Sequence, residues 1–228
     1  MVGHVVVGRN HHIESDIIRW TAVRDTLKSI ARGLALLAVL PALASFRIRA
    51  ALMGANRALE GSTQTLALIP GVLGQYLRRA FLAQTIAACH PTAVISFGTL
   101  FSQTGARIED GVYVGAGCHL GLVHIEHDAL LGSGVHVTSG RHTHGTGQTD
   151  PSTREQEGRR TLVRIGASVW VGNAAVIMAD VGPNSIIGAG AVVTKPIPAS
   201  VVAVGVPARV IRHREPAEAA SRESPLST

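Results

Sequence analysis

The chain has 228 residues, of which 46% are hydrophobic and 16% charged, so it can bury a full core without disulfide staples. Aromatic residues make up 4% while glycine occurs 25 times, which favours many short strands over large helices packed on aromatic rings. The net charge of +6 would suit nucleic acid, but the basic residues are not interleaved with stacking aromatics, so we expect no nucleic-acid partner. Anionic lipid or a phosphate-bearing cofactor is at least as good a partner.

Two cysteines, Cys89 and Cys118, have no partner at metal-ligand spacing, and no secretion signal precedes them. This usage is typical of a reducing compartment. We therefore expect a cytoplasmic protein.

Residues 1–90 are predicted to form a helical region. It contains the uncharged run GLALLAVLPALASF at 33–46, flanked by basic residues. The run is shorter than the roughly 20 residues of a membrane-spanning helix and contains Pro41. Two interpretations stay open. One is a buried helical hairpin or a subunit-facing helix, and the other is an interfacial helix resting on an anionic membrane surface at the inner leaflet.

Beyond residue 90, aliphatic residues recur at a spacing of six, and Gly or Glu follows most of them. A period of six is neither helical nor simply alternating. It suits a triangular coil with one short strand on each side and one aliphatic side chain pointing inward, and stacked coils bury a continuous ladder. The pattern predicts a mainly β fold, a parallel β-helix, over residues 91–213. The ladder positions are Ile108, Val114, Leu120, Ile125, Leu131, Val137, Ile165, Val171, Ile177, Val181, Ile187 and Val193.

With this ladder, the chain resembles the left-handed parallel β-helix acyltransferases of the hexapeptide-repeat family. The segment VVTKPIPASVVAVGVPARVIR is similar to the closing segment of that family. Residues 66–89 and the following FGTLFSQTGARIEDGVYVGAGCHLG resemble the branch that O-acetylates sugars of bacterial surface polysaccharides. The resemblance implies a left-handed coil, a homotrimer with active sites between subunits, acetyl-CoA as co-substrate, a sugar acceptor linked to lipid or nucleotide, and no metal.

Between Val137 and Ile165 the ladder skips 28 residues, which is not a multiple of six, so a loop leaves the β-helix there. The loop begins with SGRHTHG, in which His142 and His144 would point the same way in an extended segment. In the resembled family, a histidine at the start of this loop is the general base, a role that suits an imidazole. The resemblance selects His142 as the base and His144 as second candidate. Arg141 could orient a phosphate or the acceptor. The alternative is that these side chains merely solvate a loop.

The resemblance also assigns residues to the acetyl-CoA cleft. Asn173, in WVGN, matches a position that contacts the pantetheine arm, and GAGAVVTK contributes Ala189, Thr194 and Lys195 to the rest of the site. Arg209 could face the nucleotide phosphates. For each of these residues, ordinary coil packing or a solvated face is the alternative.

His119 stands where many family members have an asparagine that contributes to acceptor binding, so the acceptor contact departs from the family pattern. The step from His119 to His124 also reproduces the paired spacing of metal ligands in trimeric β-helix metalloenzymes of the carbonic anhydrase type, which need a third histidine from the facing subunit. A non-catalytic β-helix assembly protein is a further alternative. Residues 214–228 are expected to form a disordered tail.

Overall fold

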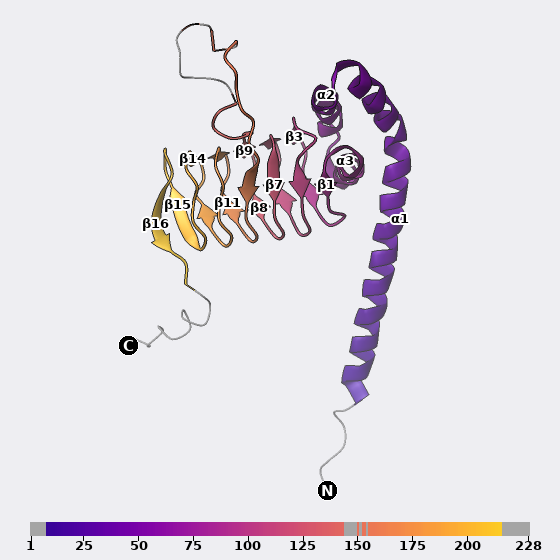
Figure 1. Ribbon diagram of the computed structural model, residues 1–228. Coiled ribbons are helices and arrows are strands. Elements are labelled where there is room, and N and C mark those ends of the chain that lie inside the picture. The colour runs from indigo at the N-terminus through magenta and orange to yellow at the C-terminus, as the bar shows by residue number, and fades with distance from the viewer. Residues whose placement is uncertain (1–7, 144–149, 151, 154, 216–228) are drawn as a thin grey trace, which may run out of the picture.

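The computed structural model describes the backbone of residues 8–143, 150, 152–153 and 155–215, and the side chains of this set from residue 23 onward. The loop residue His144 and the predicted tail from residue 216 onward lie outside the described residues. Three helices, α1 (Gly8–Met53), α2 (Ala55–Ala67) and α3 (Gly71–Thr85), precede a stack of short strands (Figure 1). The predicted fold class, a parallel β-helix behind an N-terminal helical region, is confirmed.

Three sheets form the sides of the β-helix, and successive coils pair in parallel register. The four-stranded sheet contains β1 (Ala88–Cys89), β4 (Arg107–Ile108), β7 (Val123–Ile125) and β10 (Val163–Ile165). The five-stranded sheet contains β3 (Leu100–Phe101), β6 (His119–Leu120), β9 (His136–Val137), β12 (Val176–Ile177) and β14 (Val192–Val193). The seven-stranded sheet contains β2 (Val94–Ile95), β5 (Tyr113–Val114), β8 (Leu130–Leu131), β11 (Trp170–Val171), β13 (Ile186–Ile187), β15 (Val201–Val204) and the antiparallel β16 (Arg209–His213).

The aliphatic ladder forms the core of the β-helix. All the ladder residues named from the sequence are buried, with exposed fractions of 0–3%. A second inward position lies two residues before most ladder residues and holds small or β-branched side chains such as Val112, Ala129 and Ala175. Most coils are therefore filled by one large and one smaller side chain on a side, which is how short strands bury a dense core with few aromatic rings.

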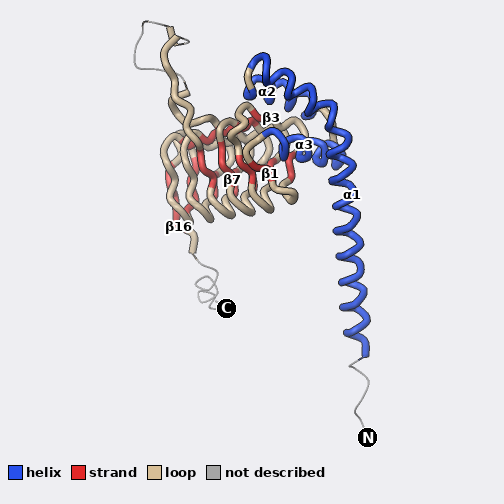
Figure 2. The backbone as a smooth tube through the Cα atoms, turned by 45° about the vertical axis from the view of Figure 1, so that its right-hand side comes forward, coloured by secondary structure: helices blue, strands red, loops and turns tan. Residues whose placement is uncertain are grey.

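Helices α2 and α3 cover the first coil, where the ladder would otherwise end in solvent (Figure 2). Leu59 from α2 and Phe81 from α3 are fully buried against it. Arg78, which is 2% exposed, donates hydrogen bonds to the carbonyl oxygens of Leu66, Ile69 and Ile95 at 3.1, 2.7 and 3.0 Å. One guanidinium thus ties the end of α2, the following turn and β2 together, so the two helices form a cap of the kind that repeat folds require.

Helix α1 continues through Pro41 and has two apolar faces on opposite sides. Consecutive helical residues are about 100° apart, so positions two apart, such as Leu37 and Val39, point in nearly opposite directions. The inner face contacts α2 and α3. It carries the buried residues Ala35, Val39, Leu43 and Phe46.

The outer face of α1 carries large aliphatic side chains at alternating spacings of four and three, which keeps them in one stripe. We call this set the outer stripe, and its side chains are 52–63% exposed: Val23, Leu27, Ile30, Leu34 and Leu37. Taken alone, residues 33–46 are too short to span a membrane, as the sequence indicates. The helix is continuous well beyond this run, however, and Val23–Met53 is long and apolar enough to cross a membrane. Helices of this composition also lie flat on bilayers or pack between subunits, so length alone does not decide among these placements.

Candidate active site

The predicted loop leaves the β-helix after β9 and is closed at its base by a backbone stem. The amide of Thr161 donates to the carbonyl oxygen of Ser139 at 2.8 Å, and the amide of Arg159 donates to that of His142 at 2.6 Å. Gly140 has a φ of +87°, and a Cβ there would collide with the side chain of Thr161. The outgoing and returning strands can therefore approach this closely only because residue 140 is a glycine.

His142 and Arg141 are exposed at the outer end of this stem. The stem uses the carbonyl group of His142 and leaves its imidazole without a hydrogen bond or ion pair to the described part of the chain. A side chain held at its backbone and free at its ring can meet a substrate. The position that the family resemblance selects for a base is thus exposed in the described structure.

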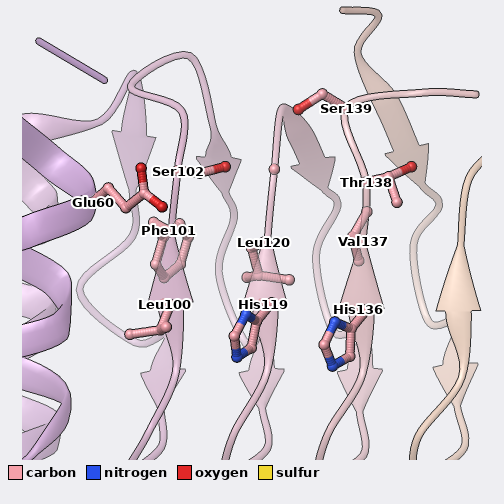
Figure 3. A pocket seen from close by; sticks show the side chains of 11 residues that line it. Glu60, Leu100, Phe101, Ser102, His119, Leu120, His136, Val137, Thr138 and Ser139 are labelled. Atoms are coloured by element: carbon pink, nitrogen blue, oxygen red, sulfur yellow. The ribbon is translucent and has the colours of Figure 1, made fainter. Parts of the chain in front are cut away.

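A cavity of about 240 Å³ lies on the five-stranded sheet beside the stem (Figure 3). Glu60 reaches its edge from α2, and residues from β3, β6 and β9 form its floor. Its polar lining comprises Glu60, Ser102, His119, His136, Thr138 and Ser139. Thr138 and Ser139 also begin the loop stem, so the cavity is continuous with the segment that carries His142.

Two imidazoles stack in this cavity. His119 and His136 pair in register on β6 and β9, with ring centroids 4.7 Å apart and planes 14° from parallel. Burial, followed by the charge that His136 would carry, lowers the pKa of His119. An uncharged His119 ring can both donate and accept hydrogen bonds. Sequence reasoning did not identify His136, although both histidines directly precede a ladder residue.

The structure does not bring His119 and His124 together. His124 lies on β7 in the four-stranded sheet, where its Nε2 is 2.7 Å from Glu109 Oε1 and its Nδ1 is 3.2 Å from Arg164 Nη1. Because a guanidinium only donates, Nδ1 accepts and Nε2–H donates to Glu109, and this hydrogen bond lowers the pKa of Glu109. Among the described residues, no group of three or more His, Cys, Asp or Glu side chains could hold a metal ion.

The residues predicted to contact acetyl-CoA fall into separate groups. Asn173 and Ala189 lie at one corner, where the amide of Gly190 donates to the Asn173 carbonyl oxygen at 2.8 Å. The Asn173 side-chain oxygen is itself occupied by the amide of Ser133 at 2.9 Å. Thr194 and the exposed Lys195 directly follow β14, whereas Ala189 precedes this strand. Arg209 is exposed at the start of β16 and donates to the carbonyl oxygen of Ala208 at 3.0 Å.

Comparison with known proteins relates the chain to acetyltransferases. It is 58% identical over 52 residues to galactoside O-acetyltransferase of Escherichia coli K12, covering 22% of this chain and 26% of that protein. It is 32% identical over 124 residues to the putative lipopolysaccharide biosynthesis O-acetyl transferase WbbJ of the same strain, covering 50% of this chain and 61% of that protein. The resemblance to hexapeptide-repeat acetyltransferases is confirmed.

The match to these acetyltransferases is partial in length. The chain spans 26%, 48% and 61% of three curated relatives, the second being the serine acetyltransferase of Mycobacterium tuberculosis H37Rv, which is 34% identical over 116 residues or 50% of this chain. A solved structure of a galactoside acetyltransferase in complex with coenzyme A has a TM-score of 0.49 and 24% identity, covering 70% of this chain and 82% of that chain. No protein-family model matches the chain.

Proposed function

We propose that this protein is an acetyl-CoA-dependent O-acetyltransferase that modifies a sugar hydroxyl during bacterial surface polysaccharide synthesis. The observation that carries the proposal is the exposed imidazole of His142, fixed on a backbone stem beside a polar cavity. It occurs on a β-helix related in sequence to sugar O-acetyltransferases.

In the proposed reaction, His142 accepts the proton of the acceptor hydroxyl while the hydroxyl oxygen attacks the thioester carbonyl carbon of acetyl-CoA. The bond from this carbon to sulfur breaks, the acetyl group passes to the sugar oxygen, and the protonated His142 gives its proton to the CoA thiolate. A positioned base of this kind contributes about 100- to 10,000-fold in rate. We propose direct transfer without an acetyl-enzyme, because burial raises the pKa of both thiols of the chain, Cys89 and Cys118, and so disfavours the nucleophilic thiolate.

The cavity beside the stem suits a sugar acceptor. Its hydroxyl, carboxylate and imidazole groups can donate to and accept from several sugar hydroxyls at once. His119 stands at the position where many members of the resembled family have an asparagine, and its ring nitrogens and those of the stacked His136 offer an alternative polar contact there. The relative WbbJ is named for lipopolysaccharide biosynthesis, which supports an acceptor carried on a lipid or a nucleotide.

We propose that acetyl-CoA binds to the residues that the family resemblance selects. Among the described residues, the amide of Ser133 bonds the side-chain oxygen of Asn173, which leaves the NH₂ group of Asn173 to donate to acetyl-CoA. Ala189, Thr194 and Lys195 flank β14 and offer small or cationic side chains. Arg209 adds a second exposed cation for the phosphate groups of acetyl-CoA.

A homotrimer completes the proposed site. Tyr113, Leu130 and Trp170 stand side by side on the outer surface of the seven-stranded sheet, in parallel register. They are among the exposed large hydrophobic residues, and such a row on an outer sheet surface suits contact with a second subunit. Between two such subunits, a cleft forms in which His142 and the acetyl-CoA residues can face one substrate pair.

We also propose that α1 places the enzyme on the cytoplasmic side of an anionic membrane. The outer stripe supplies an exposed aliphatic surface, and Arg24 and Lys28 lie on other faces of the same helix. This separation of aliphatic and cationic residues is typical of helices at a membrane interface. It would bring a lipid-linked glycan near the catalytic cleft.

The test of the proposed reaction is acetyl-CoA turnover against a panel of lipid-linked and nucleotide sugars. We expect His142→Ala to lower kcat about 100-fold or more while changing acetyl-CoA affinity little, because the imidazole meets the acceptor. The matched control is His213→Ala, which removes an exposed histidine from β16 and should leave kcat unchanged.

Near-normal turnover of His142→Ala together with an inactive His144→Ala would transfer the role of base to His144. Full activity of both variants would exclude a loop histidine as the base. Absence of turnover with every sugar, together with intact folding, would favour the non-catalytic assembly protein. Stoichiometric metal that depends on His119 would instead favour the metalloenzyme.

A further inference from the structure

A second cavity, of about 150 Å³, lies where α1 passes α3 and the first coil of the β-helix. Helix α1 contributes Arg32 and Leu36, α3 contributes Tyr76 and Arg79, and Cys89 reaches it from β1. None of these residues lines the cavity beside the loop stem. The second cavity is therefore separate from the proposed acetyl-transfer site.

The charges in the second cavity are not neutralised. No carboxylate lines it, and neither Arg32 nor Arg79 takes part in an ion pair with the described residues. Burial, followed by the nearby charge of Arg32, lowers the pKa of Arg79, so the two cations are close enough to repel each other. In the isolated chain, the cavity thus holds two like charges that an anion would stabilise.

Hydrogen-bonding capacity in the cavity is also unused. The Nε of Arg32 is buried and has no hydrogen-bond partner among the described residues, and a buried donor without a partner is unfavourable. The guanidinium carbon of Arg79 lies 4.6 Å from the centroid of the Tyr76 ring, which holds this side chain in place by a cation–π contact. One arginine is therefore positioned and the other retains a free buried donor.

We propose that Arg32 and Arg79 bind the phosphoryl group of an anionic ligand in this cavity. Planar guanidinium groups match phosphate oxygens with paired hydrogen bonds, which chloride or a single carboxylate oxygen cannot match as well. The volume equals that of about five water molecules, enough for one phosphoryl group but not for a nucleotide. Leu36 and the alanines of α3 provide an apolar wall for the group esterified to the phosphate. The phosphoryl group belongs either to a lipid headgroup or to a soluble phosphate.

The experiment titrates the full-length chain with inorganic phosphate at constant ionic strength and follows calorimetry and thermal melting. We expect saturable binding that Arg32→Gln and Arg79→Gln each weaken at least about tenfold, in keeping with loss of a charged hydrogen bond. The matched control, Arg212→Gln, removes the same charge from the exposed strand β16 and should change affinity less than about twofold.

A second readout separates binding from a structural role. Without phosphate, Arg32→Gln and Arg79→Gln should melt at the wild-type temperature or higher, because the repulsion between the two cations is relieved. Phosphate should then no longer raise the melting temperature. A lower melting temperature in phosphate-free buffer, with the phosphate response retained, would overturn the proposal. Equal weakening by Arg212→Gln, or no saturable binding to the wild-type chain, would also overturn it.

Vesicles distinguish the two sources of the phosphoryl group. If phosphatidic acid vesicles bind with the same dependence on Arg32 and Arg79, and inorganic phosphate competes, the ligand is a lipid headgroup. If phosphate binding depends on both arginines but vesicle binding does not, the ligand is a soluble phosphate. These binding measurements need no acetyl transfer, so they test the phosphoryl site independently of the proposed function.

Discussion

The β-helix and helix α1 both carry regularly spaced aliphatic side chains, yet they bury them very differently. Within each run, ladder residues repeat every six positions, and they are 0–3% exposed. The outer stripe alternates spacings of four and three and is 52–63% exposed. In the β-helix, the partner of each coil is the next coil of the same chain. The partner of the outer stripe is not part of the described chain. Periodicity therefore predicts the element, while burial depends on where its partner lies.

The largest expected effect comes from making the same substitution, leucine to alanine, in each of the two regions. We expect Leu131→Ala, in the ladder, to lower the free energy of unfolding by about 2–5 kcal/mol, because it leaves a cavity in a dense core. Leu37→Ala, in the outer stripe, should change it by less than about 0.5 kcal/mol in detergent-free buffer. Chemical denaturation measures both. An equal cost at Leu37 that grows with protein concentration would mean that a second copy of the chain covers the stripe.

A second prediction concerns the point where the β-helix gives way to the loop. Gly140→Ala should cost about 1–3 kcal/mol, because a Cβ meets both a positive φ and the side chain of Thr161. Gly117→Ala is the matched control, since Gly117 has a φ of +69° but open space around a built Cβ. The control should show the backbone strain alone, and only Gly140→Ala should also lower turnover. Similar turnover in both variants would show that the stem does not position His142.

A third prediction tests whether the missing partner of α1 is a membrane. Each Lys or Arg near an anionic surface contributes about 1 kcal/mol, so Lys28→Gln should weaken binding to anionic vesicles about fivefold. Arg212→Gln is the control and should not. Flotation of the wild-type chain should also fall as salt is raised, because the Debye length is about 10 Å at 0.1 M. Equal recovery with neutral and anionic vesicles would refute the electrostatic part of the membrane proposal.

The smallest expected effect involves the stacked histidines. Because the folded state lowers the pKa of His119, the unfolded chain binds more protons, and stability should fall as the pH drops below the unfolded value of about 6.5. His119→Gln should flatten this dependence in melting curves taken across that range. His136→Gln should flatten it only in part, since burial is the larger cause of the shift. A steeper dependence in His119→Gln would contradict the assignment.

Local patterns made much of the fold and part of the site predictable. The six-residue spacing identified the buried ladder, and its break after Val137 located the loop. Both features depend only on residues that are close together in the sequence. The stacking of His119 on His136 escaped prediction because it depends on how coils align, and the step from Leu120 to Ile125 is five residues and not six. The continuity of α1 through Pro41 and the capping role of Arg78 also escaped, since both depend on contacts between distant segments.

The stem at Ser139 and Thr161 has an evolutionary consequence. Because these two residues are hydrogen-bonded to each other, the ends of the loop meet at a fixed point, whatever lies between them. The entropy of closing a flexible loop grows only slowly with its length, by about 0.6 kcal/mol per doubling. Insertions and deletions beyond the stem can therefore accumulate without shifting the register of β9 or β10. The loop can therefore vary in length and sequence while the coils on either side of it keep their strand pairing.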